Sequence, residues 1–118
     1  MKLKQTLSMA AMGLCCLGAS AQEINMPIIQ TKYTADPAPY VFNDTIYLYT
    51  THDEDNSEGF NMQDWLLYTS TDMVNWQDHG SVASLKDFKW YKGNNGAWAE
   101  QVIHRNGKWY MYCPIHGN

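Results

Sequence analysis

Apolar and β-branched residues occur in short runs along the chain, and turn-forming residues separate the runs. Val41-Phe42, the pair Asn43-Asp44 and the run 45–51 have the order of a β-hairpin, because the second arm is rich in strand-forming residues. Residues 65–70 form the next predicted strand, and the following residues lead into an edge segment that ends near His79-Gly80. The pattern predicts about four strands between residues 38 and 80.

The same arrangement begins again later in the chain. Residues 102–104 and 109–113 flank Asn106-Gly107, a dipeptide typical of a tight hairpin turn. Three positions repeat at separations of 61, 63 and 63 residues: Val41 with Val102, Tyr47 with Tyr110, and Tyr49 with Tyr112. We ascribe the difference to a longer second turn. Strands that recur at this period favour the blades of an all-β propeller over the main alternative, an immunoglobulin-like sandwich.

The length of the chain limits how much of a propeller it can form. A propeller has at least four blades, whereas these residues supply one blade and about half of another. A half-blade leaves an open edge, which favours aggregation. We therefore predict that the 118 residues are the N-terminal fragment of a five-bladed protein of roughly 300 residues or more. The predicted division is a signal peptide at 1–21, an N-terminal lead-in at 22–32 and an incomplete propeller domain at 33–118.

The first residues have the pattern of a secretory signal peptide. Lys2 and Lys4 are basic, the run 7–17 is apolar except for Ser8, and Ala19-Ser20-Ala21 is a typical cleavage site. The apolar run is too short for a membrane span, which needs about 20 residues. We expect a secreted or periplasmic protein without a membrane span, whose single remaining cysteine, Cys113, forms no intrachain disulfide.

The charge of the mature part argues against some classes of partner. Two of the eight lysine and arginine residues lie in the predicted signal peptide, which leaves six against twelve acidic residues, a net charge of −6. Such a balance disfavours nucleic acid and anionic membranes as partners. Aromatic side chains are abundant; they pack cores by default, and they also stack on sugar rings.

Asp36 is the most informative acidic residue. Pro37 and Pro39 stiffen the backbone around it, and a residue before proline is driven toward extended conformations. A rigid backbone suits a catalytic carboxylate, which must be placed accurately. The alternative is an ordinary turn, since Asp-Pro also initiates turns.

Several segments together resemble glycoside hydrolase family 43. They are Ala35-Asp36-Pro37 before the first strand, Tyr-Leu-Tyr-Thr-Thr-His-Asp at 47–53, Tyr-Thr-Ser-Thr-Asp-Met-Val-Asn-Trp at 68–76, and Trp98-Ala99 followed by Asn-Gly-Lys-Trp-Tyr at 106–110. The resemblance covers residues 33–118. It implies a five-bladed propeller enzyme that cleaves arabinosyl or xylosyl linkages of plant cell-wall oligo- or polysaccharides.

The resemblance also implies a mechanism. In this family, the aspartate of the first-blade motif is the general base of an inverting hydrolysis, which assigns that role to Asp36. An inverting glycosidase pairs such a base with a carboxylic acid that protonates the leaving group. The family's general acid and its pKa-modulating aspartate lie in later blades, so we expect the fragment alone to be inactive.

Glu100 departs from the family pattern, in which Trp-Ala-Pro is followed by an acidic residue. Here Glu100 stands at the proline position and Gln101 at the acidic one. We therefore interpret Glu100 as structural, not catalytic.

Four further residues are candidate substrate-binding residues: His52, Asp53, Trp98 and His116. Each has an alternative interpretation, namely a strand-end cap for the first two, blade packing for Trp98 and a position one residue out of register for His116. The histidines and Cys113 are too scattered for a zinc site, and we predict no metal and no cofactor in this segment. A structural calcium bound by later blades is compatible with the resemblance.

Two other classes compete with the hydrolase. A non-catalytic carbohydrate-binding propeller would keep the aromatic residues and lack the downstream acids. A propeller of the invertase type usually carries Asn-Asp-Pro at the first motif, and Ala35 argues against it.

Overall fold

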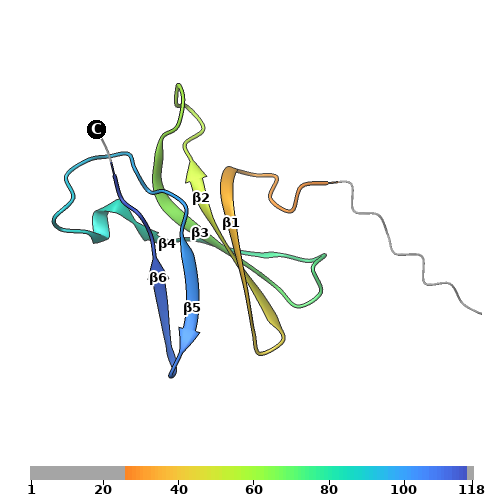
Figure 1. Ribbon diagram of the computed structural model, residues 1–118. Coiled ribbons are helices and arrows are strands. Elements are labelled where there is room, and N and C mark those ends of the chain that lie inside the picture. The colour runs from red at the N-terminus through yellow and green to blue at the C-terminus, as the bar shows by residue number, and fades with distance from the viewer. Residues whose placement is uncertain (1–25, 117–118) are drawn as a thin grey trace, which may run out of the picture.

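The computed structural model describes residues 26–116, which form an all-β structure (Figure 1). The predicted signal peptide at 1–21 and the first residues of the lead-in lie outside the described residues. In chain order the elements are β1 (Tyr33–Phe42), β2 (Thr45–Asp53), β3 (Met62–Ser70), β4 (Gln77–Ser84), the 3₁₀ helix η1 (Leu85–Asp87), β5 (Gln101–Arg105) and β6 (Lys108–Tyr112). Strands β1 to β4 form an antiparallel sheet in sequential order, and β5 and β6 form a separate hairpin.

Both predicted hairpin turns are present, and each contains two residues. Asn43 and Asp44 have φ angles of 47° and 57°, and Asn106 and Gly107 have 52° and 72°. Positive φ at both central residues is the requirement of the type I′ turn, which matches the twist of the flanking strands. The prediction of both turns from the sequence is therefore confirmed.

The equal turns correct one detail of the predicted repeat. Phe42 pairs with Thr45 across the first turn and Arg105 with Lys108 across the second, so the second turn is not longer. The two hairpins are therefore related by a uniform shift of 63 residues. Val102 then corresponds to Pro39 instead of Val41.

The fourth strand runs further than the predicted edge segment. β4 ends at Ser84, beyond His79-Gly80, and Gly80 has a φ of 70° where β4 is out of regular register with β3. Residues 71–76 form a loop organised by Asp72, whose Oδ1 accepts hydrogen bonds from the amides of Val74 and Asn75 at 2.9 and 2.8 Å. The Asn75 side-chain and backbone bonds hold the pKa of Asp72 well below its usual range.

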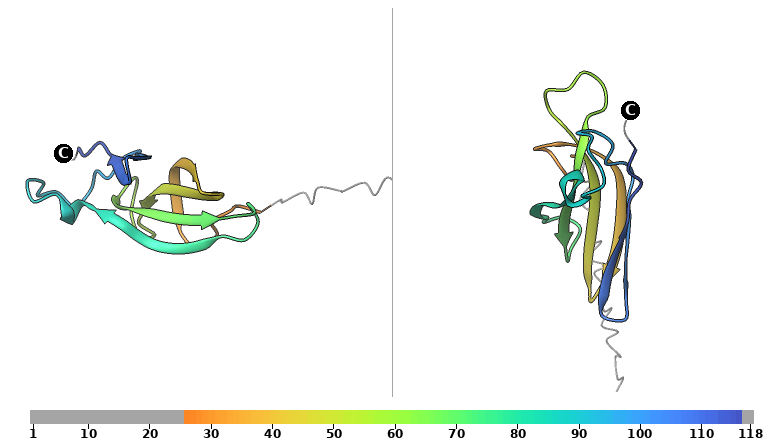
Figure 2. Two further views of the ribbon diagram at one scale, coloured as in Figure 1. Left: turned by 90° about the horizontal axis from the view of Figure 1, so that it is seen from below. Right: turned by 90° about the vertical axis from the view of Figure 1, so that its left-hand side faces the viewer.

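Apolar side chains cover both faces of the four-stranded sheet. On one face, Leu48, Leu66 and Tyr68 pack with Ile29 of the lead-in and with Trp76. The hairpin β5–β6 lies over the other face, nearest to β1 (Figure 2). There Val102 packs against Ala38 and Tyr49. The sheet is thus one complete blade, and the hairpin is the start of a second.

The connection between the two units is fixed to the end of the first sheet. The amides of Gly96 and Ala97 donate to the carbonyl oxygen of Met62 at 2.9 and 3.0 Å, and Asn95 Oδ1 accepts from the Met62 amide at 2.9 Å. Trp65, which is fully buried, donates its indole N–H to the carbonyl oxygen of Trp98 at 2.9 Å. These bonds determine where the chain enters β5. No helix within residues 26–116 has the length and apolar character needed to cross a membrane.

Candidate active site

Asp36 lies on a β-bulge in the edge strand β1. Ala35 pairs with Thr51 and Ala38 with Tyr49, so Asp36 and Pro37 together oppose the single residue Thr50. Asp36 has a φ of 51°, in the left-handed region, which differs from the extended conformation predicted from the following proline. The bulge is the physical reason, because two residues opposite one require a local change of backbone direction. Bulges of this kind re-aim a side chain, and β1 accepts proline there because it is an edge strand.

The carboxylate of Asp36 is held by a buried hydroxyl group. Thr51 Oγ1 donates a hydrogen bond to Asp36 Oδ2 at 3.1 Å. Thr51 is fully buried in β2, whereas Asp36 itself is exposed. A rigid threonine on a central strand thus fixes one oxygen of a carboxylate that water can reach. Aspartate side chains are ordinarily ionised at neutral pH, so this arrangement can accept a proton from water.

Glu100 is a second carboxyl group associated with Asp36. It is only 6% exposed, and neither of its carboxylate oxygens has a hydrogen-bond partner within the described residues. Burial raises the pKa of Glu100 to about 7, and the negative charge of Asp36 adds to this rise. The sequence offered little sign of this burial, which depends on how β5–β6 stacks on the sheet.

His52 and Asp53 make contacts at the end of β2 that stabilise the following loop. His52 Nδ1 lies 2.8 Å from Asp64 Oδ1 on the neighbouring strand β3. Asp53 Oδ1 accepts a hydrogen bond from the Asn61 amide at 2.8 Å, and the Glu54 amide donates to the Asn61 carbonyl oxygen at 2.9 Å. His52 thus connects β2 to β3, and Asp53 anchors the loop 54–61. The role of these two residues toward a sugar stays a prediction.

Three side chains in this region could together hold a cation. His52, Glu54 and Asp64 each offer a ligand atom, and these atoms lie within 4.8 Å of one another. The hydrogen bond between His52 and Asp64 already accounts for two of the three groups.

Trp98 and His116 are brought together, in a pocket that neither His52 nor Asp53 lines. The Trp98 indole N–H donates to the His116 carbonyl oxygen at 2.8 Å, and both residues line a surface pocket with Phe60, Tyr91 and Asn95. Trp98 also packs on the core cluster around Trp65. Trp98 therefore both packs on the core and lines the pocket. Asp36 is not among the residues that line this pocket.

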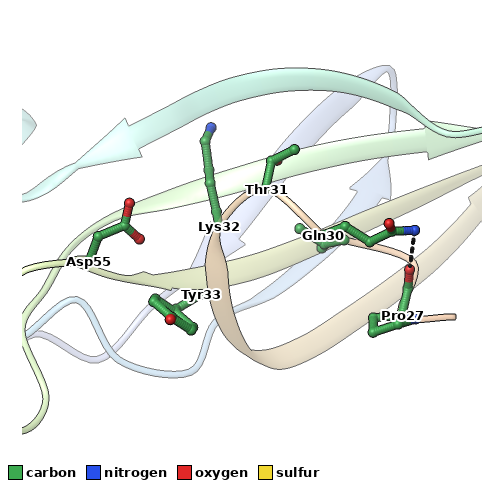
Figure 3. A pocket seen from close by; sticks show the side chains of 7 residues that line it. Pro27, Gln30, Thr31, Lys32, Tyr33 and Asp55 are labelled. Carbon is green, nitrogen blue, oxygen red and sulfur yellow. Dashed lines mark hydrogen bonds between the residues drawn. The ribbon is translucent and has the colours of Figure 1, made fainter.

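A further pocket lies where the lead-in meets β1 (Figure 3). Gln30, Lys32, Tyr33 and Asp55 are among its lining residues, and Gln30 Nε2 donates to the Pro27 carbonyl oxygen at 3.2 Å. Asp36 is not among the lining residues. The pocket thus brings together none of the residues that the sequence singled out.

The fold and the carboxylate define a class of protein: a β-propeller chain that carries an accessible acid on the bulged edge strand β1 of its first blade. The model of the family described as glycosyl hydrolases family 43 matches residues 24–118, and the chain belongs to this family. The resemblance inferred from the sequence motifs is thereby confirmed, together with the all-β propeller fold.

Individual relatives agree with this assignment. The xylosidase/arabinosidase of Bacteroides ovatus is 36% identical over 97 residues, a match that covers 75% of this chain and 29% of the relative. Xylosidase/arabinosidase 43A of Humicola insolens is 32% identical over 98 residues, covering 75% and 29%. The chain thus spans less than a third of the length of these relatives.

Solved structures are similar over the same region. The GH43_1 enzyme from Xanthomonas citri, solved in complex with xylose, superposes with a TM-score of 0.69 at 33% identity, over 78% of this chain and 27% of that one. The RS223 β-xylosidase gives a TM-score of 0.64 at 37% identity, over 72% and 28%. The blade and the following half-blade thus correspond to 27–28% of these longer chains.

Proposed function

We propose that the protein containing this segment is a glycosidase that cleaves arabinosyl or xylosyl linkages of plant cell-wall saccharides with inversion, and that Asp36 is its general base. The observation that carries the proposal is the exposed carboxylate on a bulged strand, fixed by the buried Thr51. Membership of the family and the printed activities of its relatives as xylosidase/arabinosidase support the substrate class.

The proposed chemistry is a single displacement. Asp36 accepts a proton from a water molecule as the water oxygen attacks the anomeric carbon, and the bond to the leaving-group oxygen breaks. A carboxylic acid from a later blade donates a proton to that oxygen. Inverting enzymes keep their two carboxyl groups roughly 6.5–9.5 Å apart to accommodate the water, which a base near the propeller axis permits.

The substitution Asp36→Asn in the full-length protein tests the base assignment. General base catalysis contributes about 10²–10⁴-fold, so we expect a loss of kcat in that range on aryl arabinosides and xylosides. Asp44→Asn is a matched control, because Asp44 is also an exposed aspartate with positive φ but lies in the hairpin turn. Unchanged turnover in Asp36→Asn would refute the assignment. Proton NMR of the first-formed sugar distinguishes inversion from retention.

We also propose that the protein is exported to the periplasm or outside the cell. The proposal rests on the basic start, the apolar run and the Ala-Ser-Ala site at 19–21. Mass spectrometry of the mature protein is expected to find Gln22 as its first residue. An N-terminus that still carries residues 1–21 would contradict export by this route.

A further inference from the structure

Asp36 and Glu100 belong to the two segments that meet at the interface between the sheet and the hairpin. Val102 of β5 packs against Ala38 of β1 and Tyr49 of β2. Ala35 packs on the apolar cluster that contains Ala97, so Asp36 and Glu100 each lie between the same two apolar contacts along their segments. Thr51 of β2 lies two residues beyond Tyr49 and binds Asp36.

Two titratable groups interact with Glu100 by charge. They are Asp36 of β1 and Cys113, which follows β6. Burial raises the pKa of the Cys113 thiol, and the charge of Glu100 adds to this rise. No salt bridge within residues 26–116 involves Glu100. A buried carboxyl group without a counter-charge strongly favours its neutral form.

Neither carboxylate oxygen of Glu100 has a hydrogen-bond partner within residues 26–116. A buried polar group without a hydrogen bond costs about 1–3 kcal/mol, and native proteins retain few such groups. An apolar residue at the position would avoid this cost. A carboxyl group that is buried, unpartnered and next to a proposed catalytic carboxylate is therefore a candidate for a functional role.

We propose that Glu100 is a positioning residue for Asp36. While Glu100 is neutral, Asp36 carries the only negative charge of the pair. When Glu100 ionises, the arrangement of the site is disrupted. Two neighbouring carboxylates repel each other, so ionisation of the buried Glu100 displaces Asp36 from Thr51. This inference rests on the proposed role of Asp36 as the base. Glu100 touches neither water nor sugar in the proposed reaction and acts through Asp36 alone.

The pH profile of the full-length protein tests the proposal. The substrate is an aryl arabinoside or xyloside with a very good leaving group, because its cleavage needs no proton from the general acid. We expect wild-type kcat to fall at least several-fold as the pH rises through about 7, the pKa of Glu100. Glu100→Gln keeps the neutral shape and cannot ionise, so its kcat is expected to stay level over the same range.

Glu58→Gln is the matched control for Glu100→Gln. Glu58→Gln changes an exposed glutamate in the loop after β2 and should leave the wild-type profile unchanged. If Glu100→Gln shows the same fall as wild type, the proposal is overturned. That outcome differs from failure of the proposed function, in which Asp36→Asn would remain active at every pH.

Direct titration keeps the proposal testable if Glu100→Gln does not fold. Carbon-13 NMR of glutamate carboxyl groups should reveal one group in the wild-type protein that titrates near pH 7. In Asp36→Asn this titration should move to lower pH, because the neighbouring negative charge is removed, whereas Asp44→Asn should not move it. A glutamate titration that is insensitive to Asp36→Asn would overturn the proposed coupling.

Discussion

At the scale of single residues, the site depends on side chains whose surroundings the sequence does not reveal. The motif around Asp36 identified the residue, but its left-handed backbone arises from pairing with β2 across a bulge. The Asp-Pro dipeptide by itself favours an extended conformation, so the prediction of its backbone was wrong. Burial of Glu100 likewise requires the hairpin to lie on the sheet. Both features follow from contacts between segments distant in the sequence.

Substitution of Thr51 tests whether its hydroxyl group positions the base. Thr51→Val removes the hydrogen bond to Asp36 and preserves the shape of the buried side chain. A hydrogen bond to a charged group contributes about 1.5–3 kcal/mol, which corresponds to roughly a 10- to 100-fold lower kcat if the bond acts in the transition state.

Steady-state kinetics of the full-length variant measures this effect. KM should change little, because Thr51 does not contact the sugar in the proposed reaction. Thr51→Ser retains the hydroxyl group and serves as the control. Equal kcat values for the valine and serine variants would contradict the positioning role.

At the scale of secondary-structure elements, the local sequence predicted the structure better than it did for the surroundings of single residues. Asn-Asp and Asn-Gly specified two type I′ turns, and the turns determined the register of both hairpins. The later end of β4 was missed because Gly80 resembles the end of a strand, whereas it occupies an irregularity within the strand. Turn chemistry is local, whereas the extent of an edge strand depends on its partner.

The second turn provides a test at this scale. Gly107 has a φ of 72°, and no atom lies within 4 Å of a Cβ added there, so Gly107→Ala introduces backbone strain without a clash. Left-handed backbone costs a non-glycine residue about 1–2 kcal/mol, and we expect unfolding of the full-length protein to become easier by that amount. Gly107→Asn should recover much of the loss, since asparagine tolerates positive φ. Urea unfolding measures both variants, and equal stability of alanine and glycine would contradict the turn assignment.

At the scale of the whole molecule, the described residues form one blade and the first hairpin of the next. β6 has β5 as its only strand neighbour within residues 26–116. It exposes Trp109, Tyr110 and Tyr112, with 40%, 41% and 61% of their surfaces accessible. An unpaired strand edge with exposed aromatic side chains is a template for association. Membership of a propeller family explains why such a surface exists, since blades pack against one another.

The isolated 118-residue chain should therefore behave differently from the full-length protein. We expect it to self-associate in sedimentation experiments. We also expect it to hydrolyse no aryl arabinoside or xyloside, because the proposed mechanism takes its general acid from a later blade. Tyr112→Lys should reduce self-association by charging the exposed strand. A monomeric, active fragment would contradict both the incomplete propeller and the proposed division of catalytic groups.

The left-handed backbone at Asp36 also constrains how this position can change during evolution. Asparagine and glycine accept such a φ, whereas valine, isoleucine and threonine accept it poorly. A lineage that loses the proposed hydrolysis while keeping the propeller is therefore expected to replace Asp36 by asparagine or glycine before any β-branched residue. The bulge would then persist in descendants that lack the proposed activity, because asparagine and glycine accept the same backbone conformation.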